Sequence, residues 1–499
     1  MAWTPDQPWP ALSAQQGVTP GGAARREWSG YVRFWLLAEI AAGNPFHAGA
    51  HQYDRLNAGN VLGDASGSMI TFGPADELSA DPTGLPTTSH LWADLSCDCV
   101  SVTRTLGAST AAGVLSNAEA SVIDVELFDP TGKYDPLNPS SVYALNGRTR
   151  LVPGVRVLAF AEVVTDPVAV PPKVVRYPLF NGTADRWSEA WAREPGDRRG
   201  KMQATDFTKN MVKMDRAEQP PVGAGDRVLD RVNRIANYFG FNPPTQWGVP
   251  PVDRTLAATT LAQSAWELLN RTMDDELAFM YITPSMPTAG VVGQGIVYSI
   301  RESWTDGTAP NLSIGCGGAG FFDIATDAVP TAFDAAMINT VHAARAGGTS
   351  QTAANASSVN KWGTLEYNRT DLGLADDAQV AKWANDLVVL SAFPRTALDR
   401  LVMEPAVGGG QPPWLAWKEI LSRSPYFVTQ VTRVVYENDN FDYLVDINVR
   451  RIGDTQRITA ERWEVEWRTV SADVMAGASV LHAGPHAADR LDAGNVLGV

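Results

Sequence analysis

Cysteine is nearly absent from this sequence, which has only Cys97, Cys99 and Cys316 in 499 residues. An odd and sparse set cannot form a disulfide framework. Cys97 and Cys99 are separated by one residue, so on a strand both side chains would point to the same face. A zinc site would need further ligands at matching spacing, and none lies nearby. We therefore interpret the pair as small, buried, structural side chains.

Basic charge is also scarce. The chain has 40 Lys and Arg residues against 55 Asp and Glu residues, for a net charge of −15. The nearest approach to a basic run is residues 194–201, whose Gly and Pro are typical of a solvated hairpin tip. A protein that binds duplex nucleic acid normally needs a basic face. We therefore do not expect specific nucleic-acid binding.

Long apolar runs are missing. No run approaches 18 apolar residues, so we expect no membrane span. Residues 1–6, Met-Ala-Trp-Thr-Pro-Asp, have neither the basic start nor the apolar core of a signal peptide. We expect synthesis in a cytoplasm and a chain that stays soluble until it assembles.

Catalytic motifs are missing as well. The sequence has no Gly-x-Ser-x-Gly, P-loop or His-Glu-x-x-His, and neither His90 nor His342 stands in a triad context. The glycine-rich residues 315–320 lack the strand-then-helix setting of a dinucleotide loop, so we interpret them as a flexible loop. Carboxylate pairs such as Asp376-Asp377 are plentiful, and that pair suits the start of a helix. We expect no enzymatic activity and no cofactor.

The sequence does contain the alternating apolar and polar pattern of β-strands, and this pattern is strongest from Leu91 to about Asp215. In residues 119–128, Ser121, Ile123, Val125 and Leu127 alternate with polar positions, which predicts a half-buried strand. Residues 155–164 and 176–187 predict two more strands, the second with an Asn-Gly step inside it. Short strands with frequent turns indicate a sandwich or barrel. Residues 31–41 are compatible with a strand or a short helix.

Helical periodicity follows. Residues 226–240 present one apolar face with Gly240 at the C-cap position, and residues 261–280 repeat the pattern. With a strand at 295–301, this predicts a small α+β domain. Residues 310–360 are rich in Gly, Ala, Ser and Thr, and we interpret them as loop-rich.

The rest of the chain again shows mainly the sequence pattern of β-strands. A third helix is indicated by Val380, Trp383, Ala384, Leu387 and Val388 on one face. Strands are expected around residues 398–404, 427–437, 441–451 and 461–470. The whole chain is therefore predicted to be β-dominated α+β.

An internal repeat is the most specific feature. The segment His47-Ala-Gly-Ala-His51-Gln-Tyr-Asp-Arg-Leu-Asn-Ala-Gly-Asn-Val-Leu-Gly63 recurs at residues 482–498, 435 residues later, with 13 of 17 positions identical. Two distant copies do not make a solenoid. Each is too short to bury a core, so we interpret it as a docking motif that adds an edge strand to another surface. The shared docking residues are Asp54, Arg55, Leu56, Asn60, Val61 and Leu62, and Asp489, Arg490, Leu491, Asn495, Val496 and Leu497.

Four of the six histidines lie in the repeat: His47, His51, His482 and His486. A His-x-x-x-His pair on a helix would suit zinc, but Gly49 and Pro485 disfavour a helix here. One histidine per chain around a threefold axis would be another way to build a metal site. Docking through ordinary hydrogen bonds is the preferred interpretation.

The β region also resembles a known family. The series runs Ala120-Ser-Val-Ile-Asp-Val-Glu-Leu-Phe-Asp-Pro-Thr-Gly-Lys-Tyr-Asp-Pro, then Pro153-Gly154, Leu179-Phe-Asn-Gly182 and Ala204-Thr-Asp206-Phe. It resembles the minor tail, or baseplate-hub-like, proteins of long-tailed (siphovirus-type) phages of actinobacteria. Later segments, Ser264-Ala-Trp-Glu-Leu-Leu269 and Trp463-Glu-Val-Glu-Trp467 among them, follow the same plan, so the resemblance covers roughly residues 90–475.

The resemblance implies two tube-like β-barrel or sandwich domains with helices, a smaller α+β domain and extended termini. The expected boundaries are 1–90 for the N-terminal arm with the first repeat copy, 91–215 and 311–475 for the tube-like domains, 216–310 for the small domain, and 476–499 for the tail with the second copy.

The function implied is a structural hub at the distal end of a virion tail. Three copies would form a ring with a DNA exit channel, through which DNA passes without specific binding. The implied partners are further copies of the chain, the distal tail or tube protein, the tape measure protein and other minor tail proteins. An acidic channel wall would repel phosphate.

Two other functions remain open. The 16 tryptophans would permit a receptor- or carbohydrate-binding tail protein, which requires a row of exposed Trp on one face. A tail-associated cell-wall hydrolase would require a cleft with two carboxylates or a metal. The hub requires most Trp side chains to be buried or at subunit interfaces.

Overall fold

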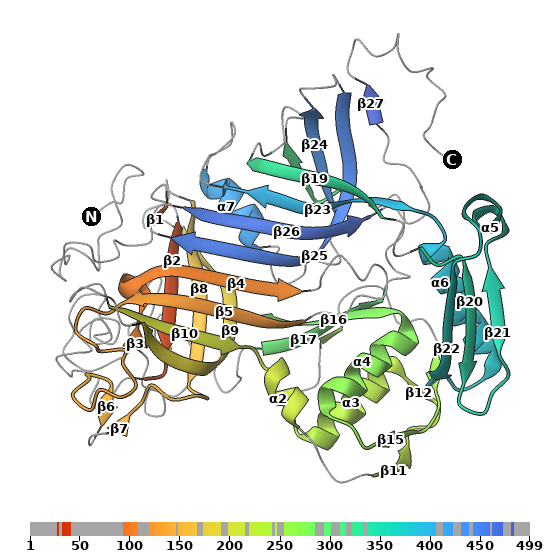
Figure 1. Ribbon diagram of the computed structural model, residues 1–499, viewed down its shortest axis with the longest axis horizontal. Helices are drawn as coiled ribbons and strands as arrows, with labels where there is room; N and C mark the ends of the chain where they lie inside the picture. Colours follow the sequence, from red (N-terminus) through yellow and green to blue (C-terminus); the bar gives the residue numbers. More distant parts are fainter. Residues whose placement is uncertain are drawn as a thin grey trace.

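The computed structural model describes most of the chain between residues 93 and 472, with short pieces on either side (Figure 1). The described residues are 27–28, 32–40, 93–107, 119–145, 148–166, 173–190, 198–214, 219–241, 245–246, 254–284, 294–300, 310–315, 322, 324–333, 337–405, 413–422, 431–438, 443–459, 462–472 and 481–483.

One large sheet dominates the molecule, with the strand order β1-β2-β8-β9-β10-β5-β4-β25-β26-β23-β19. Strands β3, β18, β24 and β27 are attached to its members. The bounds are β1 Glu27–Trp28, β2 Val32–Ala38, β3 Ala93–Asp94, β4 Cys99–Gly107, β5 Glu119–Phe128, β8 Arg156–Asp166, β9 Lys173–Ala190, β10 Arg199–Thr205, β18 Leu312–Gly315, β19 Ala325–Phe333, β23 Arg395–Met403, β24 Val431–Asn438, β25 Tyr443–Thr459, β26 Trp463–Ser471 and β27 Leu481–Ala483.

The sheet follows the alternation seen in the sequence. On β5, Ser121, Ile123, Val125 and Leu127 are buried while Asp124 is exposed, as the pattern predicts. Strand β9 runs unbroken through the Asn181-Gly182 step. The apolar segment after residue 31 is a strand, β2, and its central residues are buried because β8 pairs with one edge and β1 and β3 with the other.

The first hydrophobic core lies on one side of this sheet and includes residues from both ends of the chain. The Trp463 ring on β26 meets the Phe34 ring of β2 edge-on at 6.0 Å and the Trp417 ring at 4.6 Å. Trp417 belongs to α7 (Pro413–Ser422). The sheet therefore curls so that its first and last strands share one core.

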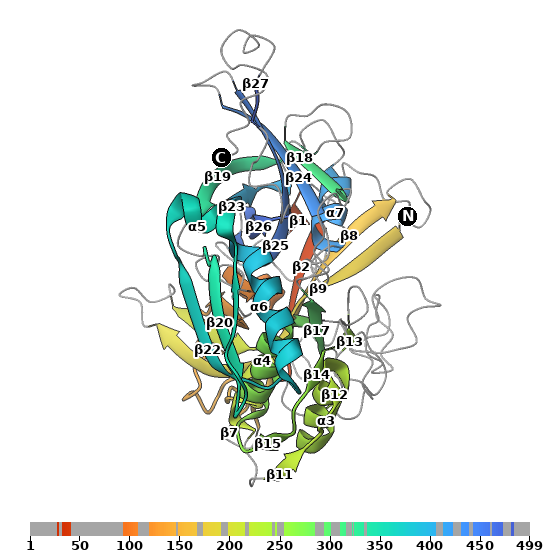
Figure 2. The same cartoon turned by 90° about the vertical axis from the view of Figure 1, so that its right-hand side faces the viewer.

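Smaller sheets and most helices lie beside the large sheet (Figures 1 and 2). The sheets are β6-β7, β11-β15, β12-β14, β13-β17-β16 and β21-β20-β22. Their bounds are β6 Ala144–Leu145, β7 Arg148–Thr149, β11 Gln219–Val222, β12 Asp226–Arg227, β13 Thr245–Gln246, β14 Thr255–Leu256, β15 Thr259–Leu261, β16 Ala278–Pro284, β17 Gln294–Ile300, β20 Thr340–Arg345, β21 Gln351–Ala354 and β22 Glu366–Leu372. The helices are η3 Ser96–Asp98, α2 Thr208–Lys213, α3 Val228–Phe239, α4 Ala265–Glu276, α5 Ala356–Trp362 and α6 Asp377–Ser391.

A second hydrophobic core joins these smaller elements. It combines the apolar faces of α3 and α4 with that of α6, where Trp383 and Leu387 are fully buried. Helix α3 ends at Gly240, which has φ 77°, and Asp376 caps α6 by accepting a hydrogen bond from the Gln379 N–H. Both ends were predicted from the sequence.

The helix expected over residues 261–280 is shorter than predicted. Helix α4 begins after Ser264, which forms a capping box with Glu267, and ends at Glu276. Leu277 then takes a left-handed conformation, φ 52°, and the chain turns into β16, whose residues are all buried. An all-apolar strand carries no alternation, so the sequence pattern could not separate it from the helix.

Residues 310–360 are not loop-rich as expected. They contain β18, β19, β20, β21 and the start of α5. Small Ala, Ser and Thr side chains give only a weak hydrophobic periodicity in the sequence. The strands form because β20 pairs on both sides, with β21 and β22. The strand on which Cys97 and Cys99 would share a face does not include both of them: Cys97 lies in η3, and the buried Cys99 begins β4.

The fold is therefore β-dominated α+β, as predicted, and the strands expected in two separate tube-like domains share one sheet. No helix among the described residues is both long and apolar enough to span a membrane.

Candidate assembly surface

The two β-rich parts of the chain meet at a seam between β4 and β25. Residues Ser101–Gly107 pair antiparallel with Gly453–Thr459, across about 350 positions of sequence. Gly107 has φ +92°, and a Cβ there would lie 2.2 Å from the Ile452 carbonyl oxygen. Only glycine allows the backbones to approach this closely. The seam thus makes one continuous sheet from two distant segments.

A buried ion pair crosses the seam. Arg104 on β4 donates to the carboxylate of Asp454 on β25, and these side chains are only 2% and 1% exposed. Arg451 Nη1 lies 3.7 Å from Asp454 Oδ2, and Gln456 Nε2 donates to the same oxygen at 3.3 Å. Removing one partner of such a pair costs about 3–5 kcal/mol because the other charge stays buried.

Arg468 on β26 ties a third strand to the seam. Its Nη2 donates to the Leu106 carbonyl oxygen at 2.8 Å, beside the close approach of Gly107 and Gly453. The Arg451 guanidinium lies over the Trp467 ring, 4.7 Å from its centroid. Ion pair, glycine contact and cation–π contact together hold the two halves in one fixed register.

The opposite face of the sheet is polar and runs across the seam without a break. Its centre is a stripe of small hydroxyl side chains, in which Ser101 faces Thr459 and Thr105 faces Thr455. Between these pairs, Thr103 faces the exposed Arg457. Lys201 and Gln203 of β10, Asp124 and Glu126 of β5, and Glu464 and Glu466 of β26 extend the face on either side.

Charges on this face are paired. Arg457 Nη1 lies 2.6 Å from both Glu464 Oε1 and Glu466 Oε2, and Arg199 Nε lies 3.9 Å from Glu126 Oε1. On β5, β10, β25 and β26 this face carries four cations (Arg199, Lys201, Arg457 and Arg468) and four anions (Asp124, Glu126, Glu464 and Glu466), and Arg186 of β9 lies opposite Gln203 on the same face. On these four central strands the charges of the face are therefore balanced, although the whole chain carries −15.

The Asp-Pro-Thr-Gly-Lys-Tyr segment after β5 forms a turn that is held by side-chain hydrogen bonds. The Asp129 carboxylate accepts hydrogen bonds from the backbone N–H groups of Lys133 (2.6 Å) and Tyr134 (2.8 Å). Asp98 accepts from the Tyr134 hydroxyl at 2.6 Å and the Lys133 ammonium at 2.7 Å. Burial, followed by the Asp98 charge, raises the pKa of Tyr134 well above its usual value. The turn holds Leu137 at its tip, 87% exposed.

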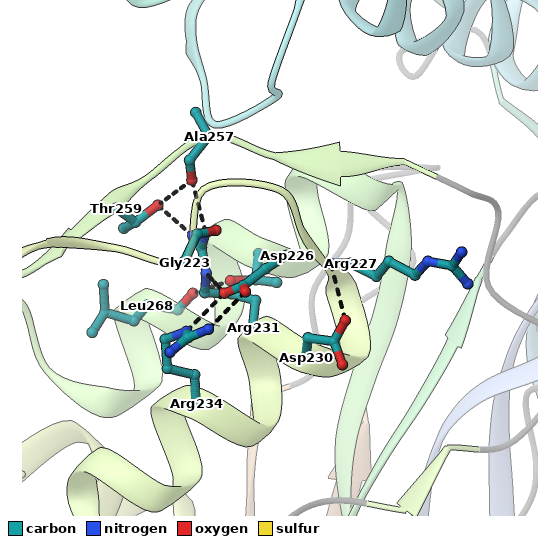
Figure 3. A network of polar contacts seen from close by, with 10 residues as sticks. Gly223, Asp226, Arg227, Asp230, Arg231, Arg234, Ala257, Thr259 and Leu268 are labelled. Atoms are coloured by element: carbon teal, nitrogen blue, oxygen red, sulfur yellow. Dashed lines mark hydrogen bonds and ion pairs between the residues drawn. The ribbon is translucent and has the colours of Figure 1, made fainter.

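A second polar network fastens the small α+β region (Figure 3). Asp226 accepts from Arg231 Nε at 3.1 Å and from Arg234 Nε and Nη2 at 2.8 Å. Arg231 Nη2 also donates to the carbonyl oxygens of Gly223 (2.8 Å) and Ala257 (2.7 Å). The hydrogen bond from Arg234 is the main reason that the pKa of Asp226 is lowered, against the effect of burial. The network fixes α3 to the neighbouring short strands.

Two buried carboxylates carry raised pKa values. Asp206 accepts from the backbone N–H groups of Ser121 (2.8 Å) and Thr208 (2.9 Å), and Asp275 accepts from the Gly373 N–H at 3.1 Å. Burial raises the pKa of each to about 6; the Arg369 guanidinium, whose Nη2 lies 3.8 Å from Asp275 Oδ1, opposes the rise there. Both acids tie one element to another. The sequence showed both acids but not their burial.

Most of the tryptophan side chains that the structure describes are buried. Among those that the structure describes, Trp35, Trp187, Trp383, Trp417, Trp463 and Trp467 are buried, and Trp266, Trp362 and Trp414 are half-buried. In the described part of the chain there is thus no row of exposed Trp.

The residues predicted for docking lie outside the described residues. This applies to Asp54, Arg55, Leu56, Asn60, Val61 and Leu62, to Asp489, Arg490, Leu491, Asn495, Val496 and Leu497, and to His47, His51 and His486. His482 is placed by its backbone alone, in β27. Within the described ranges, no group of three or more His, Cys, Asp or Glu residues is positioned to hold a metal ion.

Comparison with known proteins finds similarity at the level of chain fold. No family model and no curated protein sequence matches. A tail protein from Neisseria meningitidis MC58 is 10% identical with a TM-score of 0.45, over 75% of this chain and 92% of that one. The 43 kDa tail protein of prophage MuSo2 from Shewanella oneidensis is 11% identical with a TM-score of 0.43, over 76% and 95%. An E. coli component of the type VI secretion system, described as similar to the T4 tail proteins gp27 and gp5, is 8% identical with a TM-score of 0.37, over 75% and 73%.

Proposed function

We propose that this chain is a structural hub protein at the distal tip of a long-tailed bacteriophage tail, acting as a homotrimer without enzymatic activity. The observation that carries the proposal is the seam: a single chain joins two β-rich segments edge to edge and locks them with Arg104–Asp454. A subunit of this kind presents two sheet units side by side. Three such subunits around one axis would present six, which suits an adaptor between a sixfold tube and a threefold tip.

The polar face supports a channel role. We propose that it lines the DNA exit channel, with its stripe of Ser and Thr side chains at the centre. DNA that passes through must not stick, and a cation already paired with carboxylates, such as Arg457, has little to gain from phosphate. Charge balance would thus do what an acidic wall was expected to do.

The units and partners follow from the same proposal. Residues 91–215 and 311–475 would be the two tube-like units, 216–310 the smaller α+β unit, and 1–90 and 476–499 extended ends that reach neighbours. The proposed partners are two further copies of this chain, the distal tail or tube protein, the tape measure protein and other minor tail proteins. The siphovirus-type actinobacteriophage assignment rests on the sequence resemblance over roughly residues 90–475, in which the order of the motifs carries the weight.

The test is the mass of the purified chain. A subunit of 53.7 kDa predicts a trimer of 3 × 53.7, about 161 kDa, in native mass spectrometry. Threefold density at the tail tip of assembled particles is the matching observation. A chain that stays monomeric at every concentration and is absent from tails would overturn the hub.

The receptor- or carbohydrate-binding function is the second candidate. It requires exposed aromatic side chains, and the described Trp side chains are buried or half-buried instead. Glycan-array binding by the purified chain would favour it over the hub. Release of peptidoglycan fragments, lost when a single carboxylate is replaced, would instead favour a hydrolase.

A further inference from the structure

The repeat touches the described structure at one place, the strand β27. Its residues Leu481, His482 and Ala483 pair antiparallel with Val445, Leu444 and Tyr443 of β25. His482 and Ala483 are the first two residues of the second repeat copy. The copy therefore begins as an edge strand, which is the mode of docking that the sequence suggested.

The docking edge on β25 is short and well defined. On its other side, β25 pairs with β24 at the same residues, Leu444 opposite Glu437. On the β27 side, β26 joins only from Val449 onward. This leaves an edge of β25 that begins at Tyr443 and ends before Val449, and β27 fills Tyr443–Val445 of it, at the projecting end of the β24–β25 pair (Figures 1 and 2). Such an edge invites pairing with another chain if left open.

The first repeat copy carries the same sequence. Phe46-His47-Ala48 stands where the second copy has Leu481-His482-Ala483: an apolar residue followed by an identical pair. Edge pairing uses backbone groups and a side-chain period of two, so both strands fit the edge in one register. Each chain thus has two copies of this short sequence and, among its described residues, one edge on which β27 docks.

The length of chain between β2 and the first repeat copy limits where that copy can dock. Along β25, Val445 is 13 residues from Ile458, a path along the strand of about 43 Å at 3.3 Å per residue. Ile458 is opposite Trp463, which contacts Phe34 of β2. From Ala38, the end of β2, to Phe46 is eight residues, at most about 29 Å. Because β2 crosses the β25–β26 ladder instead of following it (Figure 1), this length of chain favours the edge of a second copy over the chain's own edge.

We propose that the β25 edge Tyr443–Val445 is a docking site for Phe46–Ala48 of a second copy of this chain, which takes the place of β27. This rests on the proposed multi-subunit assembly. In a lone subunit, β27 covers the edge. In an assembly held by larger contacts, the neighbour's first copy is tethered nearby as well, so the two strands compete at comparable effective concentration. Each subunit then holds its neighbour by a strand.

Disulfide trapping in the full chain tests the proposal. The pairs are Leu444→Cys with His47→Cys, and Val445→Cys with Phe46→Cys. Adjacent antiparallel pairs alternate between wide and close spacing, so one of the two pairs is the close type that suits a disulfide. We expect covalent dimers and trimers on non-reducing gels, and cross-links between chains when Leu444→Cys and His47→Cys are placed on separate molecules and mixed.

Control variants test the docking of the first repeat copy separately from the proposed hub function. Ala48→Cys with Leu444→Cys puts the thiols out of register and should give at least fivefold less product. Single-cysteine variants measure the background from Cys97, Cys99 and Cys316. Leu444→Cys with His482→Cys should close within one chain at low concentration, where β27 covers the edge.

Three outcomes would overturn the inference. They are a trimer by mass with no His47→Cys product, a His47→Cys bond formed only within one chain, or equal yields in and out of register. If no oligomer forms and no product appears, the hub proposal fails together with this one.

Discussion

At the scale of single residues, Arg104 is the side chain on which the seam depends most. Its guanidinium is buried against Asp454 of β25. Arg457, on the same strand, lies on the exposed polar face instead. Arg104→Met should lower the free energy of unfolding by about 3–5 kcal/mol because Asp454 stays buried. The matched change Arg457→Met should cost less than about 1 kcal/mol. Urea unfolding measures both, and an equal cost would contradict the role given to the buried pair.

Asp275 makes stability depend on pH. Its pKa of about 6 lies above the ordinary 3.8, so folding favours the protonated acid. Its contribution is therefore fully present below about pH 4 and is lost as the pH rises through 6, by about 3 kcal/mol in total. Asp275→Asn keeps an acceptor for the Gly373 N–H and cannot ionise. We expect a smaller loss of unfolding free energy between pH 4.5 and 7 in this variant.

The control for Asp275 is Asp371→Asn, since Asp371 is an exposed carboxylate that contacts the same Arg369. Its pH profile should follow that of the unmodified chain. Asp206, whose pKa is also about 6, should behave like Asp275 when replaced by Asn. An unchanged pH slope in Asp275→Asn would show that this acid is ionised in the fold without penalty.

At the scale of elements, the β4–β25 pairing depends on Gly107. Gly107 and Gly154 have nearly the same φ, +92° and +90°, but a Cβ at Gly154 would meet nothing within 4 Å. Gly154→Ala should therefore show only the backbone penalty, about 1–2 kcal/mol. Gly107→Ala adds a clash with the β25 backbone, and we expect a loss at least twice as large together with a smaller fraction of the proposed trimer. Thermal unfolding and native mass measure these, and equal losses would argue against a tight seam.

At the scale of the whole molecule, the balanced face should matter more than the net charge. Glu464→Lys with Glu466→Lys changes the net charge from −15 to −11 and frees Arg457. We expect the proposed trimer with this change to bind duplex DNA, with an affinity that falls steeply as the salt concentration rises. The control Glu366→Lys with Asp371→Lys, on β22, gives the chain the same net charge of −11 and should not bind duplex DNA. Fluorescence anisotropy of labelled duplex distinguishes the two, and equal binding would refute the special role of the face.

Local pattern in the sequence was sufficient for elements whose period is strong. The alternation of β5, the apolar face of α3 with Gly240 at its end and the Asp376 cap of α6 are set by neighbouring residues, so they could be predicted. The weakly patterned residues 310–360 could not, because β20 and its partners form only when the pairs come together. The repeat was visible from identity alone, and its edge strand β27 needed β25 to be in place.

The sequence by itself therefore determined the class of the fold, most element types and the repeat, since these depend on periods of two and 3.6 residues and on identity. Only the tertiary structure decided that β4 and β25 share a seam, that Arg104 meets Asp454 there, and that the polar face is balanced in charge. The physical reason is distance along the chain. Contacts between residues about 350 positions apart leave no trace in local pattern and arise from the burial and pairing of the whole sheet.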